Sequence, residues 1–253
     1  MEQMQTSTQQ QITARHHSTQ HQRNGHLEVV KFLYEHGADA DIHTVTNKGQ
    51  TPLHSASLNG HLEVVKFLES LVNHPDFRDK CGRTPLFFAA ARGHTAVVQF
   101  LLLCNALANV KDRYCTTPLS AAVRNGHEEV VRVLIPLTQT TTDFEGGLGQ
   151  NLVWWATRSG STTVIEVVHQ WAQRTGITIC ENYPMLELSL AKSDKNSRWC
   201  DVCTRYISSK SRFHTCKVCH DFDICLECFG IGVHCFDASH GWALRHPDSS
   251  GGY

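Results

Sequence analysis

Hydrophobic and polar positions follow a helical period in short blocks that recur along much of the chain. The clearest block, Thr51–His61, reads TPLHSASLNGH, and it recurs as TPLFFAAARGH (Thr84–His94) and TPLSAAVRNGH (Thr117–His127). A weaker copy, NLVWWATRSGS, occupies Asn151–Ser161. The threonines that begin the first three copies are evenly spaced, and Asn151 follows the last of them at nearly the same interval. A fixed period of about 33 residues predicts a stack of repeated structural units.

Each copy predicts a pair of helices. Thr51 is a good N-cap and Pro52 suits the first helical position, where its missing N–H costs nothing. Gly60 tolerates the left-handed conformation that ends a helix, so we expect a second helix to begin at His61. The apolar residues of this second helix share one broad face: Leu62, Val64, Val65, Phe67 and Leu68. A pair this short cannot bury that face alone, so neighbouring pairs must stack.

This period, together with the T-P-L-H core of the first copy and the T-P-L start of the next two, resembles the ankyrin repeat. The resemblance implies an all-α solenoid of helix-turn-helix repeats over residues 24–182. It also implies that His54 bonds to the backbone of a neighbouring repeat, a bond that Phe87 cannot make at the equivalent position. The expected repeats are 24–47 (partial), 48–80, 81–114, 115–147 and 148–182 (degenerate).

The array is predicted to begin in the middle of a repeat. Asn24–His36 matches the second helix at Asn59–Ser70 almost letter for letter, but no T-P-L-H motif precedes it at residues 16–23. We expect a truncated piece of a longer array, the alternative being a poorly capped start at residues 22–24. Residues 1–23 are rich in Gln, Ser, Thr and His and are expected to be a disordered tail.

Cysteines are concentrated near the C-terminus. Of eleven in the chain, seven fall between Cys200 and Cys235, and their spacing begins with three C-x2-C pairs. Each such pair can place two thiolates on one zinc ion, and a tetrahedral zinc needs four ligands. Six cysteines with two further ligands therefore predict two zinc sites, and in an intracellular chain this pattern favours metal over disulfides.

The sequence around these cysteines is similar to the ZZ-type zinc finger over Trp199–His246, including Asp221-Phe222-Asp223-Ile224-Cys225. The resemblance implies a small α+β finger with two interleaved zinc sites, placed at 198–247 after a linker at 183–197 and before a tail at 248–253. The first implied ligand set is Cys200, Cys203, Cys225 and Cys228. The second begins with Cys216 and Cys219 and ends with either Cys235 and His240 or His234 and His240. We favour Cys235, because a thiolate binds zinc tightly.

Several ZZ-type fingers look like readers of free N-terminal peptides, whose terminal ammonium is taken by acidic side chains. The matching acids are Asp201, Asp221 and Asp223, although Thr204 stands where the family has a nearby Asn. The alternative is that these carboxylates cap turns and orient metal ligands.

The ankyrin resemblance implies a concave groove for a protein partner. Its residues are predicted to include two aromatic side chains and several arginines, a combination common at binding hot spots. We expect Arg124 and Arg158 at exposed positions, while Phe88 and Trp155 either face the groove or pack against adjacent repeats. The candidate groove residues are Phe88, Arg92, Arg124, Trp155 and Arg158.

Composition narrows the function further. The formal net charge of −1 gives no reason to expect nucleic acid or anionic membrane as a partner, and no apolar run is long enough to span a bilayer. Neither a phosphate-binding GxxxxGK[ST] loop nor a GxSxG elbow is present. The chain is therefore expected to be a non-catalytic, intracellular adaptor, cytoplasmic or nuclear, for protein or peptide partners. The alternative is a fragment or subunit of a ubiquitin-pathway or signalling enzyme whose catalytic part lies outside this chain.

Overall fold

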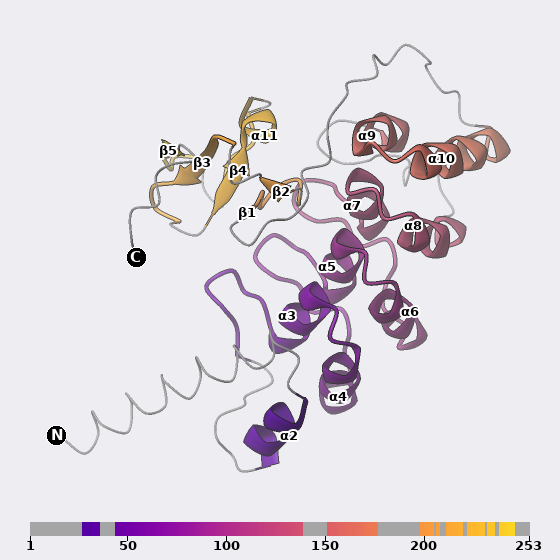
Figure 1. Cartoon of the computed structure of the whole chain (residues 1–253). Helices are drawn as coiled ribbons and strands as arrows, with labels where there is room; N and C mark the ends of the chain where they lie inside the picture. Colours follow the sequence, from indigo (N-terminus) through magenta and orange to yellow (C-terminus); the bar gives the residue numbers. More distant parts are fainter. Residues whose placement is uncertain are drawn as a thin grey trace.

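A computed structural model describes residues 27–35, 44–138, 151–176, 198–204, 206–207, 211–219, 222–230, 232–235 and 238–245. Its helices form a curved row of antiparallel pairs, and a small sheet-containing region lies beside the loops that project from one side of the row (Figure 1). The helices of the row are α2 (Leu27–Glu35), α3 (Pro52–Asn59), α4 (Leu62–Val72), α5 (Pro85–Arg92), α6 (Thr95–Leu103), α7 (Pro118–Arg124), α8 (Glu128–Leu134), the short 3-10 helix η1 (Ile135–Leu137), α9 (Leu152–Ser159) and α10 (Thr162–Arg174).

The predicted local signals begin and end these helices. Thr51 accepts a hydrogen bond from the backbone N–H of His54, and Pro52 follows at the first helical position. Gly60 ends α3 with φ of 76°, in the left-handed region that favours glycine. The same threonine-proline start recurs at Thr84 and Thr117, while Asn151 caps α9 without a proline. The helix-pair prediction is therefore confirmed for α3 to α10, and α2 is a helix where the second helix of the first repeat is predicted.

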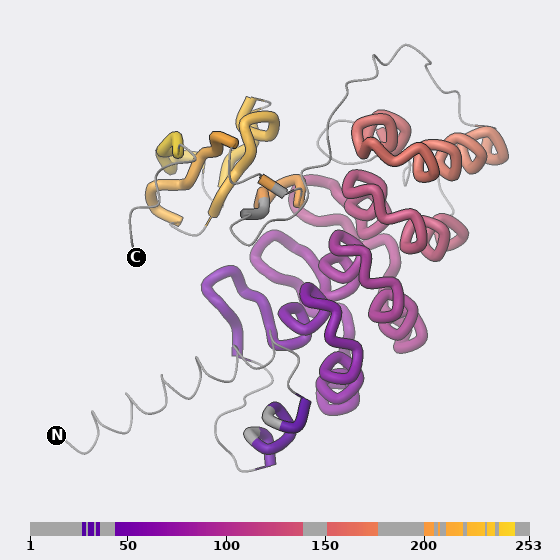
Figure 2. The backbone as a smooth tube through the Cα atoms, in the orientation of Figure 1, coloured from indigo at the N-terminus to yellow at the C-terminus, as the bar shows by residue number. Residues whose placement is uncertain are grey.

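The stacked pairs share one apolar core. Inner helices α3, α5, α7 and α9 lie side by side, and outer helices α4, α6, α8 and α10 lie behind them (Figure 2). Leu86, Val98 and Leu119 are among the residues that are fully buried between the pairs. This arrangement shows why a single pair would be unstable, since each apolar face is covered only by its neighbours.

Histidines connect successive repeats. Nε2 of His54 donates to the carbonyl oxygen of Arg83 at 3.0 Å, while its Nδ1 accepts from the backbone N–H of Thr51. His94 and His127, which directly precede the outer helices α6 and α8, bond in the opposite direction, to the carbonyls of Leu58 and Ala91 in the preceding inner helices. The expected backbone bond of His54 is confirmed. Phe87 at the equivalent position offers no ring nitrogen, and the guanidinium of Arg83 lies 4.9 Å from the centre of its ring instead.

The loops before α3, α5 and α7 repeat the same turn. Backbone hydrogen bonds close it from Thr46 to Gln50, from Asp79 to Arg83 and from Asp112 to Thr116, and the three turns follow the same period as the helix pairs. Neighbouring turns are joined by backbone bonds from Lys80 to Lys48 and from Arg113 to Cys81. We call residues 46–50, 79–83 and 112–116 the loop face of the array.

Residues 198–245, which we call the cysteine-rich lobe, form a small structure of strands and one short helix. Strands β1 (Arg198–Trp199) and β2 (Tyr206–Ile207) pair antiparallel. Strand β3 (Phe213–Cys216) is the centre of an antiparallel sheet between β4 (Asp223–Cys225) and β5 (Trp242–Arg245), and α11 (Leu226–Gly230) follows β4. A small sheet region at this place agrees with the α+β prediction.

The predicted tail at 1–23, the linker at 183–197 and the tail at 248–253 lie outside the described residues, as does the first half of the partial repeat at 16–23. Among the helices that the structure describes, none combines the length and the apolar character needed to cross a membrane.

Candidate metal centres and their contact with the repeats

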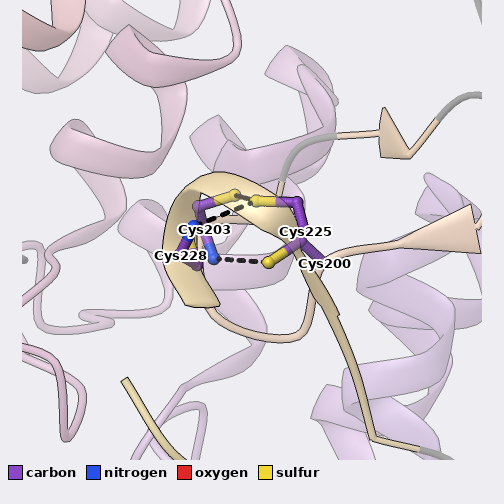
Figure 3. Close-up of side chains that lie close together, drawn as sticks. All are labelled: Cys200, Cys203, Cys225 and Cys228. Atoms are coloured by element: carbon purple, nitrogen blue, oxygen red, sulfur yellow. Dashed lines mark hydrogen bonds between the residues drawn. The ribbon is translucent and has the colours of Figure 1, made fainter. Parts of the chain in front are cut away.

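The first cluster brings together four cysteines from separate parts of the lobe. Cys200 and Cys203 lie in the turn after β1, Cys225 ends β4 and Cys228 lies in α11. Their sulfur atoms all lie within 4.8 Å of one another, and the sulfurs of Cys203 and Cys225 are 3.8 Å apart (Figure 3). This is the first ligand set that the family resemblance implies.

The second cluster contains three cysteines and one histidine. Cys216 ends β3, Cys219 follows in the next turn, and Cys235 and His240 come from the segment before β5. The sulfurs of Cys216 and Cys235 are 3.4 Å apart, and Nδ1 of His240 is 3.4 Å from the sulfur of Cys235. His234 lies elsewhere, with its Nδ1 2.9 Å from the carbonyl oxygen of Cys235. The geometry therefore groups Cys235, and not His234, with the second set.

Both clusters have the dimensions of a tetrahedral metal site. With zinc–sulfur bonds of about 2.3 Å, the edge of a tetrahedron of sulfurs is about 3.8 Å, close to the separations above. A disulfide would hold its sulfurs about 2 Å apart, and no two cysteines of the described residues are joined by one. Backbone N–H groups of Cys203, Cys219 and Cys228 point at the first sulfur of their own C-x2-C pair. Each cluster could hold a metal ion.

The thiols of the clusters differ in their readiness to lose a proton. In the first cluster, hydrogen bonds from the neighbouring cysteines, aided by the positive charge of Arg124, lower the pKa of Cys203 well below its usual range. Burial raises the pKa of Cys200. In the second cluster, burial opposes ionisation of Cys216, but backbone hydrogen bonds from Cys219 and Val218 help to outweigh it and lower the pKa of Cys216 to about 7. Thiolate formation, which metal binding requires, is thus favoured at one cysteine of each cluster.

The lobe lies on the loop face of the array and on the ends of the inner helices. The ammonium of Lys48 is 2.7 Å from a carboxylate oxygen of Asp201. Arg83 donates to the carbonyl oxygen of Val202 at 2.8 Å. Tyr114 donates from its hydroxyl to the carbonyl oxygen of His234 at 3.2 Å. These contacts join the three successive turns of the loop face to the lobe.

Helices α7 and α9 add further contacts. Arg124 donates to the carbonyl oxygen of Cys203 at 3.3 Å, and Asn125 donates to the hydroxyl of Thr204 at 3.0 Å. Arg158 forms an ion pair with Glu227 of α11. Apolar contact accompanies these bonds, because the array residues Cys81 and Tyr114 belong to the same buried cluster as the core of the lobe: Val202, Ile207, Phe222 and Ile224.

The candidate groove residues are mostly covered. Phe88 is 6 % exposed and Trp155 is 2 % exposed, so the alternative of packing within the array holds for both. The expectation that Arg124 is exposed is wrong: it is 1 % exposed, because the lobe covers it from one side while its guanidinium lies 4.0 Å from the centre of the Trp155 ring. Arg158 is half-buried over Trp154, and Arg92 is partly buried at the end of α5.

The candidate peptide-binding acids already have partners. One carboxylate oxygen of Asp201 faces Lys48, and the other accepts from the backbone N–H of Asp223 at 2.7 Å. The carboxylate of Asp223 accepts from the hydroxyl of Thr215 and is buried. Asp221 lies outside the described residues. Asp201 is thus a carboxylate that binds an ammonium group, here one from the same chain.

The sequence reasoning missed the residues through which the array holds the lobe. Lys48, Cys81 and Tyr114 occupy the same place in successive turns of the loop face, one period apart, and all three contact the lobe. The signal that could have found them is this period, applied to the loop position and not only to the helices. Asn125, paired with Thr204, and Glu227, paired with Arg158, had no such signal.

Comparison with known protein families agrees with the repeat architecture. Residues 67–144 match a family model described as ankyrin repeats in three copies, and residues 18–69 match one described as ankyrin repeats in many copies. A search of curated proteins gave no match. The matches cover the array up to residue 144 and begin six residues before its predicted start, within the predicted tail, and neither reaches the cysteine-rich lobe. Over residues 18–144 the chain therefore belongs to the ankyrin-repeat family.

Proposed function

We propose that the chain is a non-catalytic adaptor that binds protein partners and uses two zinc ions to keep its cysteine-rich lobe folded as a ZZ-type finger. The observation that carries this proposal is the pair of four-donor clusters beside an ankyrin array. Ankyrin arrays present extended surfaces for protein binding. Sulfur-rich tetrahedral donor sets suit zinc among the common metals.

Zinc would supply cross-links that the lobe cannot obtain from its own core. The lobe has short strands and one helix of 5 residues, and a region of this size rarely buries enough apolar surface to fold unaided. Four protein donors at each cluster fill a tetrahedral site, which is the pattern of structural and not of catalytic zinc. Reduced thiols also suit an intracellular location.

The experiment that tests the metal proposal is a zinc measurement on the full chain. We expect about two zinc ions per chain by elemental analysis, and a lower unfolding temperature after a chelator removes them. A matched variant, Cys115→Ser, replaces an exposed cysteine outside both clusters and should keep both ions. A purified chain that holds no zinc, and whose unfolding does not respond to zinc or chelator, would contradict the proposal.

A second candidate activity is recognition of free N-terminal peptides at Asp201, as the ZZ-type resemblance implies. It is favoured by the ammonium of Lys48 at 2.7 Å, which supports ammonium binding by this carboxylate. An incoming peptide would have to displace Lys48, so Lys48 competes with it. The buried carboxylate of Asp223 is directed at Thr215 and supports the sheet.

The test compares free and N-acetylated peptides from one library on the wild-type chain and on Lys48→Met. Recognition predicts binding that disappears on acetylation and becomes stronger in Lys48→Met, because the competing ammonium is removed. A matched control, Lys66→Met, removes an ammonium paired with Glu63 on an outer helix and should bind peptides like the wild type. Equal binding of free and acetylated peptides would reject this activity and leave the metal proposal intact.

A further inference from the structure

The face shared by the array and the lobe is complementary in charge. The array side presents Lys48, Arg83, Arg124 and Arg158. On the lobe side, Asp201 pairs with Lys48 and Glu227 pairs with Arg158. The cysteine cluster adjoins both acids in sequence, since Asp201 follows Cys200 and Glu227 precedes Cys228. The positive surface of the array therefore meets the part of the lobe that holds the first cluster.

A metal-loaded first cluster would add negative charge to this face. Four thiolates with one Zn²⁺ ion carry a formal charge of about −2. Three of the four cysteines are buried, and Cys225 is partly buried. Burying a charge of this size is costly unless opposite charge and hydrogen-bond donors lie close to it.

Arg124 lies where such a charge is needed. Its guanidinium is 1 % exposed and donates to the carbonyl oxygen of Cys203, within the turn that contributes two of the four sulfurs. It is fixed from behind by the ring of Trp155, at 4.0 Å, and by the hydroxyl of Thr116. An arginine keeps its charge when buried. This fixed cation therefore acts on the cluster whenever the lobe is seated on the array.

The turn that Arg124 contacts is also held in its shape by the array. Thr204, directly after the Cys200–Cys203 pair, has a left-handed φ of 63°, and its hydroxyl accepts from Asn125. Arg83 donates to the carbonyl of Val202, between the two cysteines. Array residues thus bind the carbonyls of Val202 and Cys203 and the side chain of Thr204, all on the one turn.

From this geometry we propose that the ankyrin array completes the first metal site, with Arg124 as a positioning residue and counter-charge for the metal–thiolate cluster, so that metal binding there and seating of the lobe stabilise each other. This inference rests on the proposed occupancy of the cluster by zinc. The two equilibria are linked. If contact with the array strengthens metal binding by some factor, then bound metal shifts the equilibrium toward the seated lobe by the same factor. Loss of metal from the first cluster would then uncover Arg124 and the loop face.

The first test measures metal affinity of the full chain by competition with a chromogenic zinc chelator, and by the cobalt(II) spectrum, which differs between four-sulfur and three-sulfur-one-nitrogen sites. In Arg124→Met we expect one of the two ions to bind at least about tenfold more weakly, as for other residues that support metal ligands. The second ion should be unchanged. Arg124→Lys, which keeps the positive charge, should lose less metal affinity than Arg124→Met.

The matched control is Arg132→Met, which removes an arginine paired with Glu128 on outer helix α8 and should leave both ions at wild-type affinity. Equal affinity of both ions in a folded Arg124→Met chain would overturn the inference while the proposed zinc sites stand. A wild-type chain without zinc would instead overturn the proposed function.

A second test reads the seating of the lobe directly and does not depend on the stability of a variant. Cys81 is buried against the lobe and is not part of either cluster, whereas Cys115 on the same loop face is exposed. With metal bound, a thiol-alkylating reagent should modify Cys115 and spare Cys81, as read by peptide mass spectrometry. After chelation Cys81 should react at least about tenfold faster. Continued protection of Cys81 without metal would overturn the linkage.

Discussion

Arg83 and Asp112, from two successive turns of the loop face, form a buried ion pair in which Nε of Arg83 is 3.0 Å from a carboxylate oxygen of Asp112. Their side chains are 4 % and 0 % exposed. The other oxygen of Asp112 accepts from the backbone N–H groups of Tyr114 and Thr116, while Arg83 also donates to Val202 in the lobe. One ion pair thus connects two loops and the cysteine-rich lobe.

Replacing Asp112 with Asn should destabilise the chain strongly. Asn keeps an oxygen for the two backbone N–H groups of the turn but leaves the guanidinium of Arg83 buried without its counter-charge. Breaking a buried pair from one side costs about 3–5 kcal/mol. The measurement is urea unfolding of the zinc-loaded chain at neutral pH.

The control for this prediction is Glu128→Gln, which removes the partner of Arg132 in an exposed pair on α8. Exposed pairs contribute little because water and salt screen them, so no measurable change in the free energy of unfolding is expected. An Asp112→Asn chain as stable as the wild type would mean that the pair is not formed in solution.

The parts of the fold that could be predicted are those with local signals. Thr51, Pro52 and Gly60 lie close together in the sequence, and each acts on the helix that contains or adjoins it, so the sequence alone places the helix pair. The membership of the two clusters followed from the C-x2-C spacing together with the ZZ-type resemblance, and the structure groups the same cysteines.

The burial of Arg124 could not be predicted, because its cause lies 79 residues away at Cys203. An arginine at the end of a helix normally faces water, but here the lobe covers Arg124 together with Trp155 of the next inner helix. The contact of Arg83 with Val202 spans 119 residues. These two contacts depend on how two folded parts meet, and the repeat period gave no signal for either arginine.

Gly60→Ala should destabilise the array by more than its backbone conformation alone explains. A left-handed φ costs a residue with a side chain about 1–2 kcal/mol. At Gly60 an added Cβ would also meet the His94 ring at 2.5 Å, displacing the ring that bonds to Leu58.

Gly176 is the matched position, with φ of 71° but, among the described residues, nothing within 4 Å of an added Cβ. Gly176→Ala should therefore show the backbone cost alone. Denaturant unfolding of both variants gives the difference between their losses of unfolding free energy. In a double-mutant cycle with His94→Ala, this difference should disappear. Equal losses in Gly60→Ala and Gly176→Ala would show that the His94 ring has room to move.

Acid should weaken the array through His54. Burial lowers the pKa of His54 to about 4, against its ordinary value of 6.5. The unfolded chain therefore binds a proton here that the folded chain excludes, and stability is full above about pH 6.5 and falls as the pH drops toward 4. Between about pH 7.5 and pH 5 this single group should cost roughly 2 kcal/mol.

The pH dependence of His54 is isolated by comparing the wild type with His54→Gln, because other groups titrate equally in both. Unfolding free energies at the two pH values should fall by roughly 2 kcal/mol more in the wild type than in the variant. If both chains lose the same amount, then His54 is protonated as easily in the folded as in the unfolded chain, contrary to its burial and its bond to the carbonyl of Arg83.

The second cluster separates Cys235 from His234, two neighbours that the sequence left as alternatives. The sulfur of Cys235 lies 3.4 Å from Nδ1 of His240, while the ring of His234 faces the carbonyl oxygen of Cys235.

Cys235→Ser should therefore lower the zinc content from about two ions per chain to about one, because a site with three donors binds zinc far more weakly than one with four. His234→Ala should retain about two ions. Elemental analysis after dialysis against a weak chelator distinguishes the two variants. Loss of an ion from His234→Ala together with retention of both in Cys235→Ser would assign the fourth ligand to the histidine and contradict the geometry of the cluster.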